Sequence, residues 1–158
     1  MGNDQVRKLV ASNRKARHDY FIEDVFEAGL VLTGTEIKSI RAGKVNIGEA
    51  HARVERGEAW LVGAHIAPWD SASRFNHGVR RDRKLLLHRI QIDQLVGKIK
   101  AKGLTIVPLR LYIDDRGRAK IELGIARGKQ LHDKRRDIAE RDARRDMQRE
   151  LANVTRGR

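Results

Sequence analysis

Apolar side chains recur with helical spacing in one segment of the chain. Ile92, Leu95, Val96 and Ile99 occupy positions i, i+3, i+4 and i+7, which places them on one face of an α-helix. Gly103 follows this segment, and glycine is the usual residue where a helix ends in a left-handed conformation. The pattern therefore predicts an amphipathic helix that ends just before Gly103.

Most of the remaining apolar positions have the spacing of β-strands. Ile121, Leu123 and Ile125 alternate with polar residues or glycine, as in a strand with one buried face. Pro108 indicates an edge or a bulge in another strand. The further predicted elements are strands over 20–32, 45–54, 59–66 and 104–113, a short helix over 35–41, a hairpin turn over 56–58 and a turn over 114–117.

Five or six strands with one clear helix and one short helix indicate a mainly β domain. Small antiparallel strands fit a closed or partly open barrel better than a doubly wound sheet. We therefore expect an OB-type small β-barrel with flanking short helices. The predicted organisation is a flexible N-terminal arm over residues 1–12, the barrel over 13–127 and a basic tail over 128–158.

The predicted tail has the spacing of a helix but little apolar surface. Ala143, Met147 and Leu151 recur every four residues, and pairs such as Arg136 and Glu140 place opposite charges on neighbouring turns. A helix this polar is marginal alone, because helices in proteins are stabilised mostly by burying an apolar face. We expect the tail to be disordered in the free protein and to become helical on a partner.

The charge of the chain indicates a polyanionic partner. Charged residues make up 35% of the sequence and the net charge is +13, an excess typical of proteins that bind nucleic acid. A soluble protein that is basic for another reason is the alternative. The chain has no cysteine, no signal peptide at its N-terminus and no apolar run of membrane-spanning length. We expect a cytoplasmic protein without a membrane segment.

No group of residues has the spacing of a catalytic or metal site. The glycines of segment 124–130 lie one residue too close for a phosphate-binding loop, and Gln130 replaces the hydroxyl that would bind magnesium. The six histidines show no ligand spacing, and a polar turn explains Asp114 and Asp115 as well as a magnesium site does. We therefore predict no catalytic residue, no metal and no cofactor, and a protein that is not an enzyme.

Three basic clusters flank the predicted core. The first spans residues 13–20 and ends at Tyr20, which could stack on a base or pack in the core. The second spans residues 80–84 and precedes three leucines of core character. The third follows the short helix and could equally be a solvated face. Each cluster is a weak signal alone, but basic clusters around an OB-type barrel together favour nucleic-acid binding.

Five blocks of sequence, in this order and at similar spacing, carry a resemblance to a known family. They are NRKARHDY (13–20), EAGLVLTGTEIKSIR (27–41), RKLLLHR (83–89), GLTIVPLRLY (103–112) and GKQLHDKR (128–135). Through them the chain resembles the family of SsrA-binding proteins, also called small protein B. The resemblance covers most of the chain, up to the first turns of the predicted tail.

One segment departs from the family pattern. Asn76 and His77 are usually followed by an acidic residue and proline, whereas Gly78 and Val79 follow here. The departure leaves the conformation of residues 76–82 open.

The resemblance implies an RNA-binding adaptor for the rescue of stalled ribosomes. Such proteins bind the tRNA-like domain of transfer-messenger RNA and deliver it to the A site for trans-translation, which tags the nascent peptide. The tail is expected to become a helix along the empty mRNA entry channel of the small subunit, with its first motif at the decoding centre. Elongation factor Tu and alanyl-tRNA synthetase act in the same pathway, and the protein is expected to be a monomer.

Two sets of functional residues are expected from the basic clusters and the family positions together. The expected RNA contacts are Asn13, Lys15, Arg17, His18, Tyr20, Glu27, Lys38, Arg41, Lys44, Arg83, Lys84, Leu87 and Lys120. The expected ribosome contacts in the tail are Gly128, Lys129, His132, Asp133, Lys134 and Arg135. Within these sets, the resemblance implies that Glu27 accepts hydrogen bonds from RNA and that His132 stacks on a ribosomal base.

Two other functions stay open on the sequence alone. A general binder of ribosomal or transfer RNA would not distinguish transfer-messenger RNA from ordinary tRNA. An RNA-processing enzyme would turn over RNA in a metal-dependent reaction.

Overall fold

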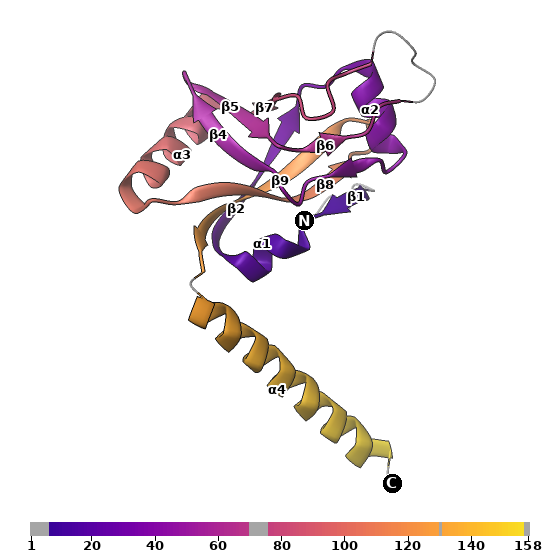
Figure 1. Ribbon diagram of the computed structural model, residues 1–158, viewed down its shortest axis with the longest axis vertical. Helices are drawn as coiled ribbons and strands as arrows, with labels where there is room; N and C mark the ends of the chain where they lie inside the picture. Colours follow the sequence, from indigo (N-terminus) through magenta and orange to yellow (C-terminus); the bar gives the residue numbers. More distant parts are fainter. Residues whose placement is uncertain (1–6, 70–75, 130, 157–158) are drawn as a thin grey trace. The chain divides into compact units, whose positions relative to one another are not determined.

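The computed structural model describes residues 7–69, 76–129 and 131–156, except for the side chains of residues 101, 102 and 131–134. The chain folds as two compact units, residues 1–127 and residues 128–158. Within the described residues, the first unit contains the β-strands and three helices, and the second contains one long helix (Figure 1).

The strands of the first unit form two sheets. The strands are β1 (Lys8–Ser12), β2 (Tyr20–Leu30), β3 (Val45–Asn46), β4 (His51–Glu55), β5 (Glu58–Val62), β6 (His65–Ile66), β7 (Arg83–Leu86), β8 (Thr105–Ile113) and β9 (Ala119–Gly128). Seven strands pair in the order β1-β8-β4-β5-β7-β2-β9, and β3 pairs with β6 separately. An additional pairing of β8 with β9 returns the order to β8. The prediction of a mainly β fold with flanking helices is confirmed.

Alternating side chains of β8 and β9 form the centre of the core. Leu111, Ile121 and Leu123 are at most 1% exposed and belong to the same core cluster, because successive residues of a strand point to opposite faces and the face that carries these three is covered. The register of β8 against β9 shifts between Pro108 and Arg110. The predicted alternation in β9 and the predicted irregularity at Pro108 are both confirmed.

Three helices flank the strands: α1 (Arg14–Asp19), α2 (Gly34–Arg41) and α3 (Arg89–Lys102). Figure 1 shows α2 and α3 at opposite ends of the strands. Helix α2 begins with a capping box in which Thr33 and Glu36 each satisfy a backbone N–H of the other. Helix α3 ends at Gly103, whose φ of 62° is left-handed, so the predicted helix end is confirmed.

Strands β4 and β5 form the predicted hairpin. Their register pairs Glu55 with Glu58 across the two-residue turn. Arg56 and Gly57 both have positive φ, at 51° and 75°, as a type I′ turn requires. Glycine adopts a positive φ readily, whereas the same conformation strains the backbone at Arg56. The turn nevertheless forms because its twist matches that of the two strands.

A buried ion network fixes the segment that departs from the family pattern. Arg83 and Glu36 are both 0% exposed, and Arg83 Nε lies 2.5 Å from Glu36 Oε2. Arg83 also donates to the carbonyl oxygens of Gly78 and Val79 at 3.2 and 3.1 Å. Arg81 donates to the other carboxylate oxygen of Glu36 at 2.5 Å. These bonds give residues 78–83 a defined path around the carboxylate of α2.

The charge of Glu36 is maintained by this network. Burial, the largest single effect, favours the neutral carboxyl group. Hydrogen bonds from Arg81, from the backbone N–H of Thr33 and from Arg83 outweigh burial and lower the pKa of Glu36. The carboxylate is therefore ionised in the folded protein at neutral pH, and it accepts three described hydrogen bonds although it is shielded from solvent.

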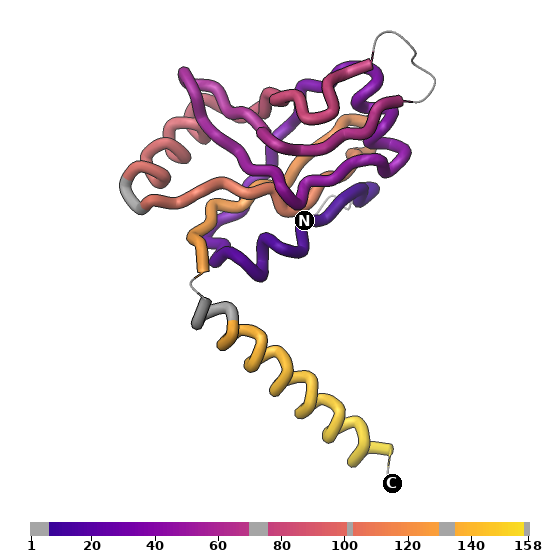
Figure 2. The backbone as a smooth tube through the Cα atoms, in the orientation of Figure 1, coloured from indigo at the N-terminus to yellow at the C-terminus, as the bar shows by residue number. Residues whose placement is uncertain are grey.

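The structure differs from the sequence prediction at the N-terminus. Residues 1–12 were expected to form a flexible arm, but Lys8–Ser12 form β1, which pairs antiparallel with β8. Figure 2 follows this strand at the start of the chain and into α1. Its apolar residues Val10 and Ala11 are only partly buried against the core and Leu9 is exposed, so the strand depends strongly on backbone pairing with a partner about a hundred residues later.

Two predicted strands are also interrupted. Segment 45–54 splits into β3 and β4, and segment 59–66 splits into β5 and β6. Gly48 lies in the first break, where its N–H donates to the side chain of Asn46 at 2.8 Å. Gly63 lies in the second with φ 81°. The glycines allow the chain to leave the large sheet and form the small β3–β6 sheet.

The second unit is the helix α4 (Leu131–Arg156). Ile138, Met147, Leu151 and Val154 are 43%, 62%, 68% and 67% exposed, so the apolar stripe of this helix is not covered. Arg136 Nε lies 3.5 Å from Glu140 Oε1, which is one of the charge pairs expected from the sequence. The disorder expected for the tail in the free protein stays a prediction.

Candidate nucleic-acid interface

Three of the expected RNA contacts, separated in sequence, line one pocket. Glu27 comes from β2, Leu87 from the segment between β7 and α3, and Lys120 from β9. The pocket has a volume of about 450 Å³. The remaining lining residues are Ala28, Gly29, Leu86, His88 and Gln91. The sheet therefore brings together a carboxylate, an ammonium group and apolar side chains in one concave surface, which we call the Glu27 pocket.

The carboxylate of Glu27 is held by two neighbours. The hydroxyl of Tyr112 donates a hydrogen bond to Glu27 Oε2. Arg7 Nη1 lies 3.4 Å from the same oxygen and 3.3 Å from the Tyr112 hydroxyl. The guanidinium carbon of Arg7 also lies 4.9 Å from the centre of the Tyr112 ring, a cation–π arrangement. These contacts fix the direction of the carboxylate.

Tyr112 is protonated throughout the physiological pH range. Burial is the largest cause of this, since it disfavours the phenolate, and the hydrogen bond and charge of Glu27 act in the same direction. Together they raise the pKa of Tyr112 well above its usual value of 10.0. The phenol is therefore a permanent hydrogen-bond donor to Glu27.

The Glu27 pocket offers complementary groups to RNA. A carboxylate can only accept hydrogen bonds, so it selects ribose hydroxyls or base N–H groups and repels phosphate. Lys120 can donate to a phosphate or a base acceptor, and it lies opposite Tyr112 in the β8–β9 register. Leu86 is 53% exposed and supplies an apolar wall. The arrangement suits a nucleotide with both donors and acceptors better than a bare phosphate.

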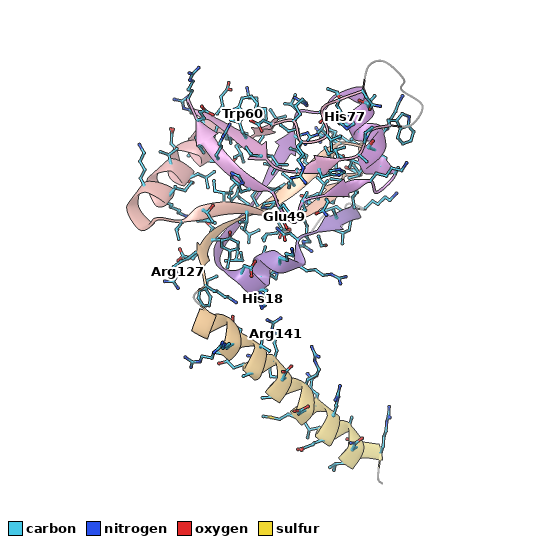
Figure 3. All side chains as sticks on the ribbon, in the orientation of Figure 1. His18, Glu49, Trp60, His77, Arg127 and Arg141 are labelled. Carbon is cyan, nitrogen blue, oxygen red and sulfur yellow. The ribbon has the colours of Figure 1, made fainter. Side chains whose placement is uncertain are left out.

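A second pocket lies beside α1 and contains part of the first basic cluster. Its volume is about 330 Å³, and Lys15, Tyr20, Glu49 and His51 are among its lining residues. Lys15 Nζ lies 3.2 Å from Glu49 Oε1. Figure 3 labels Glu49 and, on α1, His18. The exposed Lys15 and Arg17 and the half-buried His18 and Tyr20 lie on or next to this helix, as an RNA-contacting cluster requires.

Asn13 has a structural place in this cluster. It is 8% exposed, its side chain accepts a hydrogen bond from the N–H of Ala16 at 3.2 Å, and its amide donates to the carbonyl of Pro108 at 2.9 Å. It is therefore the N-cap that attaches α1 to β8. Any effect of Asn13 on RNA would pass through the position of α1.

The third basic cluster lies at the end of α2. Lys38 and Arg41 are exposed in the last turn, where cations complement the helix dipole. Lys44 follows the helix, and its ammonium group lies 5.8 Å from the ring centre of Trp69. Arg41 donates to the carbonyl of Gly117 at 3.1 Å. The cluster presents three accessible cations within one short segment.

The prediction for Arg83 is wrong as a surface contact, whereas Lys84 is accessible. Arg83 is 0% exposed and its donors are bonded to Glu36 and to backbone carbonyls, so it cannot reach RNA. The alternation within β7 places the next residue on the outer face. Lys84 is half-buried there and lies 3.1 Å from Glu58 Oε1.

The ribosome motif expected in the tail is only partly described. The side chains of His132, Asp133 and Lys134 lie outside the described residues. Gly128 ends β9, and Lys129 forms an ion pair with Asp137 of α4. This ion pair, led by the hydrogen bond from Lys129, lowers the pKa of Asp137. Arg135 is exposed on α4.

Two residues of the Glu27 pocket region were missed from the sequence. Arg7 was assigned to the flexible arm and Tyr112 only to a strand. A signal for Tyr112 was present, because a hairpin about the turn at 114–117 places residue 112 opposite residue 120. Nothing in the local pattern indicated Arg7, since its contacts depend on the pairing of β1 with β8.

The described residues contain no group of three or more histidine, aspartate or glutamate side chains that could hold a metal ion. Over the same part of the chain, no helix combines the length and the apolar character needed to cross a membrane.

Comparisons with known proteins agree on one family. A family model described as SmpB protein matches residues 10–153. The chain is 58% identical over 156 residues to an SsrA-binding protein of Roseiflexus sp. strain RS-1, with 98% of each chain covered. It is 55% identical to an SsrA-binding protein of Moorella thermoacetica, with 91% of this chain and 93% of the relative covered.

A solved structure is also similar. It is described as "tmRNA-SmpB: a journey to the center of the bacterial ribosome" and is 51% identical in sequence, with a TM-score of 0.64. The similarity covers 77% of this chain and 85% of that chain.

Proposed function

Because the chain belongs to the SmpB protein family, we propose that it is the RNA-binding adaptor of trans-translation. It binds the tRNA-like domain of transfer-messenger RNA and delivers it to the A site of stalled ribosomes, where rescue and peptide tagging follow. The names of the relatives and of the similar structure support this proposal, since they refer to SsrA binding, to tmRNA and to the bacterial ribosome.

The observation that carries the proposal is the convergence of Glu27, Leu87 and Lys120 in one pocket. These residues lie on separate elements, and a core position would need neither the exposed carboxylate of Glu27 nor the half-buried ammonium group of Lys120. A pocket with an acceptor, a donor and an apolar wall can distinguish one folded RNA from another. Basic clusters elsewhere on the unit supply attraction to phosphates without regard to sequence.

The proposed fold of the first unit is an OB-type β-barrel. The return of the pairing order to β8 supports closure of the sheet, and OB-type barrels bind nucleic acids on their strands and adjoining loops. The proposed organisation has a barrel up to residue 127 and a basic tail from residue 128. Residues 8–12 belong with the barrel in this proposal, since β1 pairs with β8.

The proposed interface includes the accessible residues of each cluster. The RNA contacts are Lys15, Arg17, His18, Tyr20, Glu27, Lys38, Arg41, Lys44, Lys84, Leu87 and Lys120. The ribosome contacts are Gly128, Lys129, His132, Asp133, Lys134 and Arg135, and the tail lies along the empty mRNA channel of the small subunit. Asn13 and Arg83 support the interface through α1 and β7.

The proposal describes a binding protein and not an enzyme, acting as a monomer in the cytoplasm. Elongation factor Tu and alanyl-tRNA synthetase are its neighbours in the pathway.

A binding titration at fixed moderate salt tests the proposal. The full-length chain and a chain ending at residue 127 are each titrated with transfer-messenger RNA and with an ordinary tRNA. We expect both proteins to bind transfer-messenger RNA tightly and tRNA poorly, because the pocket lies within residues 1–127. Equal affinity for the two RNAs would identify a general RNA binder, and loss of binding on truncation would place recognition in the tail.

A further inference from the structure

Three residues from distant parts of the chain meet at the edge of the Glu27 pocket. Arg7 precedes β1, Glu27 lies in β2 and Tyr112 lies in β8. All described contacts of the Glu27 carboxylate go to its Oε2 atom, which receives the Tyr112 hydroxyl and approaches Arg7 Nη1 at 3.4 Å. Within the described part of the chain, Oε1 receives no such contact. One oxygen is thus fixed and the other is available to a ligand.

The support for this carboxylate is rigid. Tyr112 is 6% exposed, and its strand is paired on both sides, with β1 at Leu9 and with β9 at Lys120. Because the ring of Tyr112 is held in place, it does not move with the Glu27 side chain. The hydrogen bond therefore orients the Glu27 carboxylate toward the Tyr112 hydroxyl. The raised pKa of Tyr112 keeps its proton on the phenol and therefore keeps the hydrogen bond directed at Glu27.

Arg7 completes the support. Its Nη1 atom lies 3.3 Å from the Tyr112 hydroxyl, and its guanidinium carbon lies 4.9 Å from the ring centre. Arg7 thus contacts the phenol, the ring and the carboxylate at once. Its charge offsets that of Glu27, which reduces the repulsion that an isolated carboxylate would exert on RNA phosphates.

A carboxylate in an RNA site needs such support. Each phosphate near the site opposes a negative side chain, so Glu27 favours binding only when it accepts a hydrogen bond from RNA. A flexible glutamate would lose rotamer freedom on binding, which lowers affinity. Fixing the carboxylate before RNA arrives removes that loss and leaves one direction in which a donor can approach.

We propose that Arg7 and Tyr112 are positioning residues for RNA binding, which hold Glu27 Oε2 so that Oε1 accepts a hydrogen bond from a ribose hydroxyl or a base N–H in the pocket. This inference rests on the proposed function and extends it to two residues that do not themselves touch the RNA. Tyr112 acts only through Glu27, and Arg7 acts through Glu27 and the phenol.

A double-mutant cycle tests the role of Tyr112. Tyr112→Phe removes only the hydroxyl and keeps the buried ring. In the otherwise unchanged full-length chain, we expect Kd for transfer-messenger RNA to rise roughly three- to tenfold, as for the loss of one hydrogen bond. In a Glu27→Ala background, the same substitution should change Kd less than twofold. An equal loss in both backgrounds would show a purely structural effect and overturn the proposal.

Salt dependence tests the role of Arg7. If Arg7 acts through Glu27, Arg7→Gln raises Kd but leaves the slope of log Kd against log salt unchanged. If it contacts a phosphate directly, the slope falls by roughly 0.7–0.9, which would overturn the positioning role. Lys8→Gln is the matched control, because Lys8 is the next residue and is also exposed, and its substitution removes the same charge. Thermal unfolding of each variant shows whether the fold is retained.

Two further outcomes distinguish failure of the proposed function from failure of the positioning role. If the unsubstituted chain does not prefer transfer-messenger RNA, the proposed function fails before the positioning role is reached. If it does, and Glu27→Ala weakens binding while Tyr112→Phe does not, the positioning role alone fails. Single 2′-deoxy substitutions across the tRNA-like domain of the RNA distinguish the donor. Loss of the Tyr112 effect identifies a ribose hydroxyl, and its persistence identifies a base N–H.

Discussion

Arg83 Nε and Glu36 Oε2 lie 2.5 Å apart, and neither side chain is exposed to solvent. The pair joins β7 to α2 and also orders the segment before β7 through the carbonyls that Arg83 binds. A buried pair of this kind contributes little net stability by itself, but the loss of one partner leaves the other charge buried and uncompensated.

Replacing Arg83 should therefore destabilise the first unit strongly. We expect Arg83→Met to lower the free energy of unfolding by about 3–5 kcal/mol, because Glu36 loses the cationic partner that is fully buried with it. Urea unfolding followed by circular dichroism measures the change. Lys84→Met is the matched control, since Lys84 is the adjacent, half-buried residue of the same strand, and it should cost less than about 1 kcal/mol. A similar cost for the two variants would contradict the role of the buried pair.

Acid should weaken the fold through carboxylates whose pKa is lowered on folding. The folded-state pKa of Glu36 and of Asp114 lies below the ordinary value, so each contributes stability above its unfolded pKa. That contribution is lost as pH falls through the folded pKa. We expect the urea concentration at the unfolding midpoint to decrease once the pH is lowered past about 4.5, which is near the ordinary carboxyl pKa.

Asp114→Asn tests the contribution of one of these groups. Asp114 accepts hydrogen bonds from the N–H groups of Arg118 and Arg116 at 2.8 and 3.0 Å, and the first of these is the largest cause of its lowered pKa. The amide should flatten the acid part of the stability profile and leave the basic part unchanged. An unaltered acid slope would exclude Asp114 from the effect.

Substitution by alanine should have opposite effects on stability at Gly97, within α3, and at Gly103, where the helix ends. Gly97 lies within the helix, and a Cβ added there meets no other atom within 4 Å, so Gly97→Ala should stabilise the fold by about 0.5–1 kcal/mol. Gly103 has φ 62°, and Gly103→Ala should destabilise by about 1–2 kcal/mol because an added Cβ disfavours the left-handed conformation. Thermal melts compare the two substitutions directly. Stabilisation by both would show that the helix end does not require glycine.

The cluster at the end of α2 should contribute charge rather than selectivity. Lys38→Gln and Lys44→Gln should each reduce the slope of log Kd against log salt by roughly 0.7–0.9 if each side chain neutralises one phosphate. The preference for transfer-messenger RNA over tRNA should not change. Lys100→Gln, at an exposed position of α3, removes the same charge and should leave the slope unaltered. A slope change in this control would attribute the effect to net charge.

The tail should act on the ribosome and not in RNA binding. Arg135 is exposed on α4, outside the unit that contains the Glu27 pocket. We expect Arg135→Ala to keep the affinity for transfer-messenger RNA and to lose peptide tagging on messages without a stop codon. A matching loss of RNA affinity would contradict the proposed division between the two units.

The sequence predicted the elements whose signals are local. The spacing of Ile92 to Ile99, the glycine at 103 and the turn at 56–58 each define structure within a few residues, and each is found in the structure. The apolar alternation of β9 is also local. For these elements, side-chain periodicity and backbone preference favour the same conformation.

The sequence did not predict features that depend on distant partners. Strand β1 has little apolar pattern and exists because β8 offers unpaired backbone groups. The burial of Arg83 could not be inferred either, because an arginine in a basic run ordinarily lies on the surface. Only the packing of α2 beside β7 places a carboxylate where that arginine becomes an internal partner.

The candidate site shows the same limit. The resemblance to a family identified Glu27, Leu87 and Lys120, and the structure places them in one pocket. The support of Glu27 by Arg7 and Tyr112 required the registers of β1 and β9 on β8. Local patterns therefore indicate which side chains have suitable chemistry, whereas strand pairing determines which of them lie in reach of each other.

The pairing of Lys8 with Ile113 joins the beginning of the first unit to nearly its end. A chain leaves the ribosome N-terminus first, so β1 has no partner until β8 has been synthesised and released from the exit tunnel. Lys120 emerges later still. A nascent copy whose synthesis stops before β9 therefore exposes unpaired strand edges and has no complete pocket. Only copies that extend through β9 therefore present the whole pocket to RNA, and copies that stop earlier expose strand edges that β8 and β9 would otherwise pair.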